Sequence, residues 1–459
     1  MTTRASSFVS VRVVIGLCLT AWSVTTIVAN DWPQWRGPTR HGIWTETGIL
    51  DRFPDGGLTA SWRAPVRGGF AGPVVADGRV FVLDYQENPG SRTMDGMERI
   101  LALDEQTGGV LWTRDWPATY RNLHPTFATG PRATPSVDGD QIYVVGAAGM
   151  ILALETATGE PVWQVDTTAE YGITVPVYGV SGAPLVDGSL VIVLMGAEPD
   201  ALVVAFDKAT GEEAWRALPT VSEAGYAAPV IYEGGGVRQL IVWHPRGVSS
   251  LDPLTGELRW QHDWEISNAL TVASPVVAGP YLVLTHFRLG SLMLRLDQDR
   301  PGADELWRGT SRSELPGETD GLHALITTPV IIGDYLYGVG SYGELRCLDA
   351  RTGERVWETD AAVVQERWGT AMLVAHAPTG RVFIYNEMGE LILAELSPEG
   401  YTEIDRVALI TPTTRTRGGA SGRWGDRPVS WAHPAFANRH VIVRNDEEIV
   451  RLSLAAADY

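Results

Sequence analysis

The sequence predicts an all-β protein, an eight-bladed β-propeller built from four-stranded antiparallel blades. Three observations predict this fold. The 459 residues include 50 Gly and 28 Pro, which supply many tight turns and argue against a helical bundle. One turn motif recurs along the chain, and a second motif marked by proline begins each repeat. Internal repeats of 45 to 52 residues suit units of four short strands.

The recurring turn is an apolar alternation followed by Asp or Glu, then Thr-Gly, then Trp. In this turn the Asp side chain caps backbone N–H groups and the Gly takes a positive φ. The Trp follows on the outermost strand, where its ring packs against the next blade and its N–H can meet a backbone acceptor. Clear copies are 100–112, 151–163, 204–215, 249–260 and 345–357, and looser copies are 292–307 and 391–405.

The second motif is a small residue and Pro before an apolar run, and it gives eight starts. The last repeat, from His433, contains three strands and no Trp strand. Residues 58–66 carry Trp62 in the phase of the repeat Trp, with no earlier strands before it. We therefore expect the N-terminal strand to close the last blade, because closure removes a free edge that invites aggregation. The starts are Gly72, Thr134, Ala183, Ala228, Ser274, Thr328, Ala371 and His433.

Three segments follow from this reading of the chain. Residues 1–29 place Arg4 and Arg12 before an apolar run and small residues, which is typical of a secretory signal peptide cleaved after Ala29. Residues 30–61 form an N-terminal segment, whose two Trp near its start predict a buried brace over blade edges rather than a docking motif. Residues 62–459 form the propeller. We expect an exported, soluble protein, periplasmic or extracellular, with no membrane span.

Charge and ligand chemistry exclude two classes of partner. The formal charge of −19 lacks the basic footprint of a nucleic-acid-binding protein. The nine histidines form no pair at metal-ligand spacing, and the acidic stretch 297–304 departs from a calcium loop at Pro301. The sequence therefore predicts no metal site.

The connectors from each outer strand to the next inner strand carry the candidate ligand site. Four long ones, 115–133, 165–182, 309–327 and 407–432, are rich in aromatic and basic residues. Such residues suit a carboxylate, a sugar or a quinone, but they could also simply fill the axial channel and pair with nearby acids. His433 is either a ligand contact or a hydrogen-bonded core residue. The candidate ligand-binding residues are Arg132, Tyr178, His323, Trp368, Arg415, Trp431 and His433.

The Leu-Asp-x-x-Thr-Gly-Glu-x-x-Trp repeats resemble those of the pyrroloquinoline-quinone-repeat, BamB-like β-propeller family of exported bacterial proteins. The resemblance covers residues 62–459 and implies one of two functions. The first, which we favour, is a non-catalytic scaffold whose connector face binds a protein, peptide or small-molecule ligand without a cofactor. The alternative is a dehydrogenase of sugars or alcohols that uses pyrroloquinoline quinone (PQQ) and calcium. The chain lacks the adjacent cysteines and the Cys-x-x-Cys-His haem motif expected of that alternative.

Overall fold

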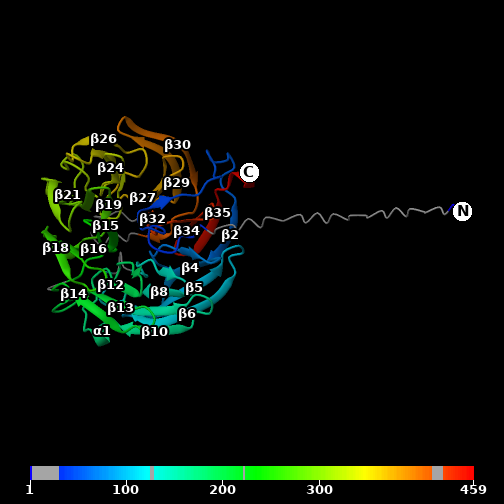
Figure 1. Ribbon diagram of the computed structural model, residues 1–459, viewed down its shortest axis with the longest axis horizontal. Helices are drawn as coiled ribbons and strands as arrows, with labels where there is room; N and C mark the ends of the chain where they lie inside the picture. The colour runs from blue at the N-terminus through cyan, green and yellow to red at the C-terminus, as the bar shows by residue number, and fades with distance from the viewer. Residues whose placement is uncertain (3–29, 125–128, 221–222, 416–426) are drawn as a thin grey trace.

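The computed structural model describes residues 1–2, 30–124, 129–220, 223–415 and 427–459, and its sheets stand around a central axis (Figure 1). Eight sheets of four or five strands form the ring in this part of the chain, so the predicted eight-bladed propeller is confirmed. Most of the predicted signal peptide, residues 3–29, lies outside the described residues. No helix in the described ranges is long and apolar enough to cross a membrane.

In the first four blades, strands run from the axis outward in chain order, as expected for repeats that each form one sheet. These blades comprise β3 (Val74–Ala76), β4 (Arg79–Glu87), β5 (Asp95–Asp104) and β6 (Val110–Thr119); β7 (Ser136–Asp138), β8 (Gln141–Val145), β9 (Met150–Glu155) and β10 (Pro161–Asp166); β11 (Leu185–Asp187), β12 (Leu190–Ala197), β13 (Ala201–Asp207) and β14 (Glu213–Ala217); and β15 (Val230–Gly234), β16 (Val237–His244), β17 (Gly247–Leu251) and β18 (Leu258–Asp263).

The other four blades follow the same order, with one strand added to blade 7 and the outer strand of blade 8 taken from the N-terminal region. They comprise β19 (Val276–Ala278), β20 (Tyr281–His286), β21 (Gly290–Leu296) and β22 (Ala303–Arg308); β23 (Val330–Ile332), β24 (Tyr335–Val339), β25 (Leu345–Asp349) and β26 (Arg355–Thr359); β1 (Ile43–Trp44), β27 (Ala371–His376), β28 (Arg381–Asn386), β29 (Glu390–Ser397) and β30 (Gly400–Ala408); and β33 (Ala435–Ala437), β34 (His440–Arg444), β35 (Glu448–Ser453) and β2 (Ala60–Pro65).

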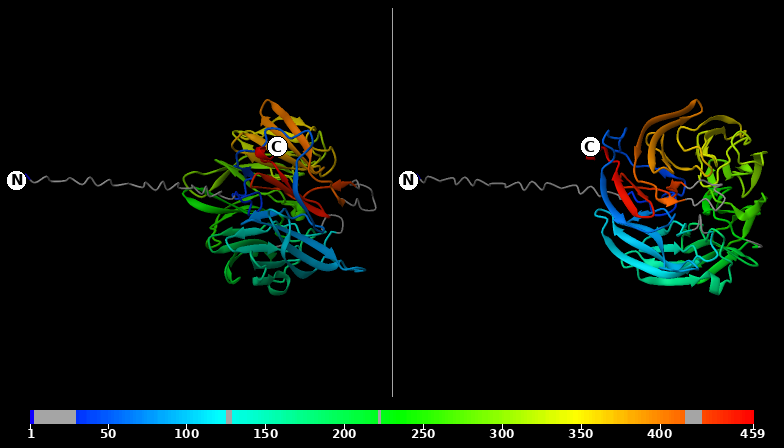
Figure 2. Two further views of the ribbon diagram at one scale, coloured as in Figure 1. Left: turned by 90° about the vertical axis from the view of Figure 1, so that its right-hand side faces the viewer. Right: turned by 180° about the vertical axis from the view of Figure 1, so that it is seen from behind.

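Short elements complete the connectors. A four-residue helix, α1, spans Thr167–Glu170, and 3-10 turns η1 and η2 span Ser267–Ala269 and Ala456–Asp458. The two-stranded ladder of β31 (Thr414–Arg415) and β32 (Pro428–Val429) projects from the same side of the disc as the turn between β4 and β5 (Figure 2). That side is the connector face.

The ring is closed as the sequence predicts. β2 pairs antiparallel with β35 in blade 8, with Trp62 opposite Arg451. The inner strand β33 of that blade contacts β3 of blade 1, so the two ends of the propeller meet. A closed ring leaves no blade with a free side face, which removes the site at which a second copy could stack.

Five of the repeat tryptophans fasten their blade to the next through the indole N–H, as the sequence predicts, whereas Trp260 donates within its own blade. The Trp163 indole N–H donates to the Lys208 carbonyl of the next blade at 2.9 Å. Its ring covers Gly211, where φ is +74° and an added Cβ would lie 2.7 Å from the indole. Trp62 makes the same bond to the Glu105 carbonyl at 2.7 Å, so the closing junction resembles the others. These contacts place the repeat residues in the scaffold.

The N-terminal residues 31–44, called the plug below, enter the centre of the ring. β1 pairs in parallel with β27 at the inner edge of blade 7. Trp32 is 2% exposed, forms a bridge with Val75 of blade 1 and packs on Phe436 of blade 8. Trp32 is therefore buried as the brace interpretation predicts.

The middle of the plug contacts the starts of the inner strands around the axis rather than the blade edges. Arg40 donates to the carbonyls of Pro229 at 2.8 Å and Pro184 at 2.5 Å, which precede the inner strands of blades 4 and 3. Trp35 donates its indole N–H to the Ser274 hydroxyl, before the inner strand of blade 5, at 2.9 Å. The plug thus donates hydrogen bonds to backbone carbonyls and a hydroxyl at the starts of the inner strands, which line the channel.

Candidate functional site

A pocket of about 520 Å³ opens on the axis at the connector face. Its floor combines Trp35 of the plug with small residues from the starts of the inner strands, including Thr134, Ala183, Ala228 and Ser274. Eight strands converge here, so only small side chains leave room for a cavity. The pocket has the volume and the concave form of sites that hold small organic ligands.

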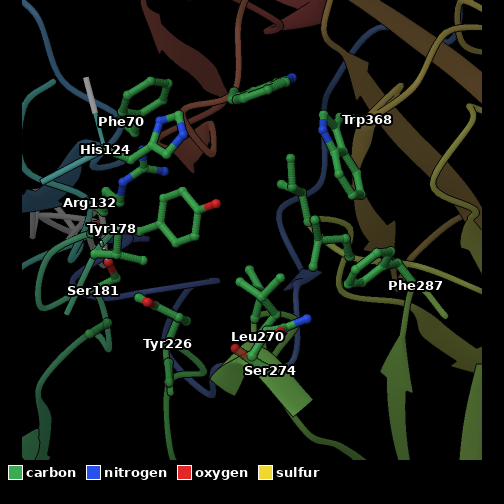
Figure 3. Close-up of a pocket in the computed structure, with 18 of the residues that line it drawn as sticks. Phe70, His124, Arg132, Tyr178, Ser181, Tyr226, Leu270, Ser274, Phe287 and Trp368 are labelled. Atoms are coloured by element: carbon green, nitrogen blue, oxygen red, sulfur yellow. Dashed lines mark hydrogen bonds between the residues drawn. The ribbon is translucent and has the colours of Figure 1, made fainter. Parts of the chain in front are cut away.

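The walls are aromatic and basic. Phe70, His124, Arg132 and Tyr178 gather on one side, and Trp368 lies across the opening from them (Figure 3). The His124 and Tyr178 rings stack with centroids 5.6 Å apart. Flat faces on both sides favour an apolar or aromatic ligand body.

The pocket is positive although the protein is acidic. The Arg132 guanidinium lies 4.3 Å from the centre of the Phe70 ring, and burial lowers the pKa of Arg132 to about 10, which still leaves it charged at pH 7. Two further lining arginines, Arg288 and Arg367, lie within 3.9 and 2.5 Å of Glu314. Among the described residues that line the pocket, none carries a carboxylate.

These groups can bind a ligand, and the two lining hydroxyls are already engaged within the protein. Burial, followed by the nearby Arg132 charge, lowers the pKa of His124, which favours the neutral imidazole. The Ser274 hydroxyl accepts the Trp35 N–H, and the Ser181 hydroxyl donates to the Gly179 carbonyl at 3.1 Å. Both hydroxyls are thus engaged in contacts that hold the walls and floor.

The structure brings four of the seven candidate residues together. Arg132, Tyr178, Trp368 and Trp431 all line the pocket. Trp368 has a left-handed backbone, with φ +65°, and its backbone N–H donates to the Ser341 carbonyl, which turns the connector toward the axis.

The other three candidates lie elsewhere or are partly described. His323 is fully buried between the Phe287 carbonyl and Asp320, at 3.0 and 3.1 Å. Arg415 belongs to β31 on the connector face, and its side chain lies outside the described residues.

His433 lies beneath the floor of the pocket. It is 5% exposed, its ring is 4.9 Å from that of Trp35, and its Nδ1–H donates to the Pro434 carbonyl at 2.8 Å. Burial lowers the pKa of His433 to about 3. It therefore contacts the plug as a neutral imidazole.

Sequence reasoning missed several wall and floor residues. Trp35 lies in a segment outside the repeats, so no periodicity places it on the axis. Phe287 and Arg288 lie in the turn between β20 and β21, and Tyr226 lies in a short connector. The strand order could have placed Phe287 on the connector face, because the turn between the second and third strands of a blade lies on the same face as the connectors.

Metal-binding side chains do not cluster. Over the described ranges, no group of three or more His, Cys, Asp or Glu is placed to hold a metal ion. Cys347 is buried in β25, where burial raises the pKa of its thiol to about 11.

The repeats, the closed ring and the axial pocket define a class of repeat β-propeller, and comparison with known proteins identifies the family. Residues 96–359 match the model of the family described as outer membrane protein assembly factor BamB. The chain belongs to this family.

Relatives carry two kinds of name. BamB of Yersinia pestis is 23% identical over 279 residues, which cover 58% of this chain and 64% of that protein. Quinohemoprotein alcohol dehydrogenase ADH-IIG of Pseudomonas putida is 30% identical over 164 residues, which cover 35% of this chain and 21% of that protein. The chain thus spans less than two thirds of either of these curated relatives.

Solved structures agree on the fold. BamB of Moraxella catarrhalis has a TM-score of 0.54 at 14% identity, covering 86% of this chain and 97% of that one. Quinohemoprotein alcohol dehydrogenase of Comamonas testosteroni has a TM-score of 0.61 at 14% identity, covering 93% of this chain and 81% of that one. At this level of identity the likeness shows a shared fold and does not indicate a function.

Proposed function

We propose that this protein is a non-catalytic binding protein that holds a ligand in the axial pocket of its connector face. The observation that carries the proposal is the pocket itself, with a closed floor, aromatic walls and arginines. The described lining offers no carboxylate to act as a general base, so its chemistry favours recognition over turnover.

Export is part of this proposal. The predicted signal peptide at residues 1–29 supports it, and so do relatives named as outer membrane assembly factors. A periplasmic or extracellular binding protein would take its ligand, a small molecule or a segment of another protein, from that compartment. Among the described residues, the pocket opens toward the connector side, with Trp35 of the plug on its floor.

A second candidate function is a PQQ-dependent dehydrogenase. It is favoured by the position of the pocket on the ring axis and by relatives named as quinohemoprotein alcohol dehydrogenases. The aromatic walls suit the flat body of a quinone. The donor set does not suit calcium, which takes oxygen ligands mainly from carboxylates and carbonyls, because the described lining contains no carboxylate.

One experiment separates the two candidates. Purified protein is mixed with PQQ and calcium, and binding is measured by calorimetry while dye reduction is followed with alcohols and sugars. We expect no substrate-dependent dye reduction. Reduction that requires PQQ, and that Tyr178→Ala abolishes while Trp163→Ala at the rim does not, would establish the dehydrogenase and overturn the binding function.

A further inference from the structure

Arg132 is incompletely bonded. Its Nε and Nη2 atoms are buried and have no hydrogen-bond partner among the described residues. A buried donor left without an acceptor costs free energy, and more so when the group is charged. The guanidinium instead has the Phe70 ring on its face, 4.3 Å from the ring centre. The missing hydrogen-bond acceptor of Arg132 is therefore one that a ligand in the pocket can supply.

The unbonded edge is the one that elsewhere in this chain holds carboxylates. In Arg99, Nε and Nη2 donate to the two oxygens of Asp84 at 2.9 and 2.6 Å. In Arg216 the same two atoms donate to Glu213 at 2.7 and 2.6 Å. This planar pair of N–H groups matches the spacing of carboxylate oxygens. The edge left unbonded in Arg132 therefore fits a carboxylate that the described lining does not provide.

Two buried arginines of the plug, Arg36 and Arg40, add positive charge near the floor of the pocket. Arg36 and Arg40 flank the floor residue Trp35 in the plug and are 2% and 4% exposed. Their side-chain hydrogen bonds end on neutral oxygens, namely backbone carbonyls and the Gln34 amide. Buried charges without a counter-charge raise the potential of a water-poor cavity, which favours an anion there.

The rest of the lining favours an apolar body. Tyr178 stands beside Arg132, and Trp368 and Phe287 face it across the cavity (Figure 3). The Phe287 and Trp368 rings meet edge to face with centroids 5.2 Å apart. These rings offer contact area at low conformational cost.

We propose that the pocket selects ligands that carry a carboxylate on an aromatic or apolar body, with the carboxylate bound by Nε and Nη2 of Arg132. This inference rests on the proposed binding function and names its ligand class. Both nitrogens are covered in the free protein, so this binding mode requires a neighbouring side chain to move when the carboxylate enters. A free aromatic acid and the C-terminus of a peptide that ends in an aromatic residue share this chemistry.

The test compares 2-naphthoate with 2-naphthamide by titration calorimetry on the full protein. The two probes have the same rings and differ in the charge of one group. We expect the acid to bind at least about tenfold more tightly, as charge-assisted hydrogen bonds imply. Arg132→Gln should reduce the affinity for the acid to that for the amide. The matched control Arg216→Gln, at a rim arginine outside the pocket, should change the preference by less than about threefold.

The outcomes separate this inference from the proposed function. Equal binding of acid and amide would overturn the carboxylate preference and leave the binding function standing. Failure of both probes at millimolar concentration would overturn both. Equal loss of preference in Arg132→Gln and Arg216→Gln would assign the effect to general positive charge and overturn the role of the Arg132 edge.

A second measurement guards against an unfolded variant. Because Arg132→Gln removes a buried charge that has no partner, its Tm should stay at the wild-type value or rise. A marked fall in Tm would identify Arg132 as a structural residue and overturn the inference.

Two peptides then distinguish the sources of the carboxylate. Gly-Gly-Phe with a free C-terminus is compared with its C-terminal amide as a competitor of 2-naphthoate. Competition by the free peptide alone supports the inference with peptide C-termini as ligands. Absence of competition by either peptide, alongside a naphthoate preference lost in Arg132→Gln, supports it with free acids as ligands. Equal competition by both peptides would contradict it.

Discussion

The rim and the axis of this propeller differ in how far their polar side chains are hydrogen-bonded. At the rim, the indole N–H groups of Trp62, Trp112, Trp163, Trp307 and Trp357 each donate to a carbonyl of the next blade. At the axis, arginines are buried with unbonded nitrogens. Most of the repeat tryptophans of the rim are bonded, with the Trp215 indole N–H an exception, whereas the unbonded nitrogens of Arg132 belong to a residue that lines the pocket, where a ligand can supply an acceptor.

The difference also separates stability from function. Removing a rim contact should cost stability and leave the pocket intact, because each rim contact joins two blades far from the axis. Removing a pocket residue such as Arg132 should change binding and cost little stability.

Deletion of residues 30–66 should affect both regions, since it removes the plug and β2 together. We expect a loss of several kcal/mol in the free energy of unfolding, because the apolar burial of Trp32, Trp44 and Trp62 is lost and blade 8 is left open. Urea unfolding of the truncated protein measures this. An unchanged midpoint and slope would show that the ring does not depend on N-terminal closure.

Trp163→Ala tests the rim alone. The ring is 8% exposed and bonded to the next blade, so we expect a loss of about 3 to 5 kcal/mol in the free energy of unfolding. Affinity for 2-naphthoate should not change. The comparison variant Trp260→Ala should lose less, since that indole donates to Gln239 of its own blade at 2.8 Å. Lost binding with full stability would place Trp163 in the site.

Acidification tests the plug through His433. The pKa of His433 is about 3 in the folded protein, below the ordinary 6.5, so the unfolded chain takes up the proton first. Its contribution to stability is present above pH 6.5 and is lost as the pH falls toward 3, by about 2 kcal/mol at pH 5. The difference in unfolding free energy between wild type and His433→Gln should therefore shift by this amount from pH 8 to pH 5. A difference independent of pH would rule out a neutral buried imidazole.

Gly211→Ala tests the turn that the Trp163 ring covers. The residue has φ +74° and lies beneath the Trp163 ring, so a methyl group strains the turn and displaces the indole. We expect a loss of about 1 to 3 kcal/mol, measured by thermal unfolding. Gly139→Ala provides a control, with φ +59° and no heavy atom within 4 Å of the added Cβ. Equal losses would mean that backbone strain alone, without the ring, sets the cost.

The blades were predictable from sequence because each one repeats the same local chemistry. Asp104 accepts the Thr107 N–H at 2.8 Å in its turn, as the motif predicts, and Trp62 closes the ring in the phase of the other repeats. Such features are set by a few neighbouring residues, so a single sequence shows them.

The site was predictable only in part. Arg132 and Trp431 lie on long connectors, whose ends must approach the axis. Trp35 reaches the pocket through contacts with residues distant in the chain, such as Ser274, and no local pattern encodes that approach. His323 is also on a connector, yet the bond to the Phe287 carbonyl turns its imidazole away from the cavity. Side-chain direction on irregular backbone depends on such individual contacts.

Ring closure also sets the order in which this protein can fold. β2 precedes the strands of blade 1 and β35 follows those of blade 7, so their pairing joins residues far apart in the sequence. Contacts of such long sequence separation form slowly, because a large loop must close before they stabilise anything. Until blade 8 is complete, blade 1 and blade 7 each expose an unpaired side, and transiently exposed surfaces of this kind favour association between copies. The strands of blade 8 make the junction with blade 1, so a chain cut before them cannot close the ring.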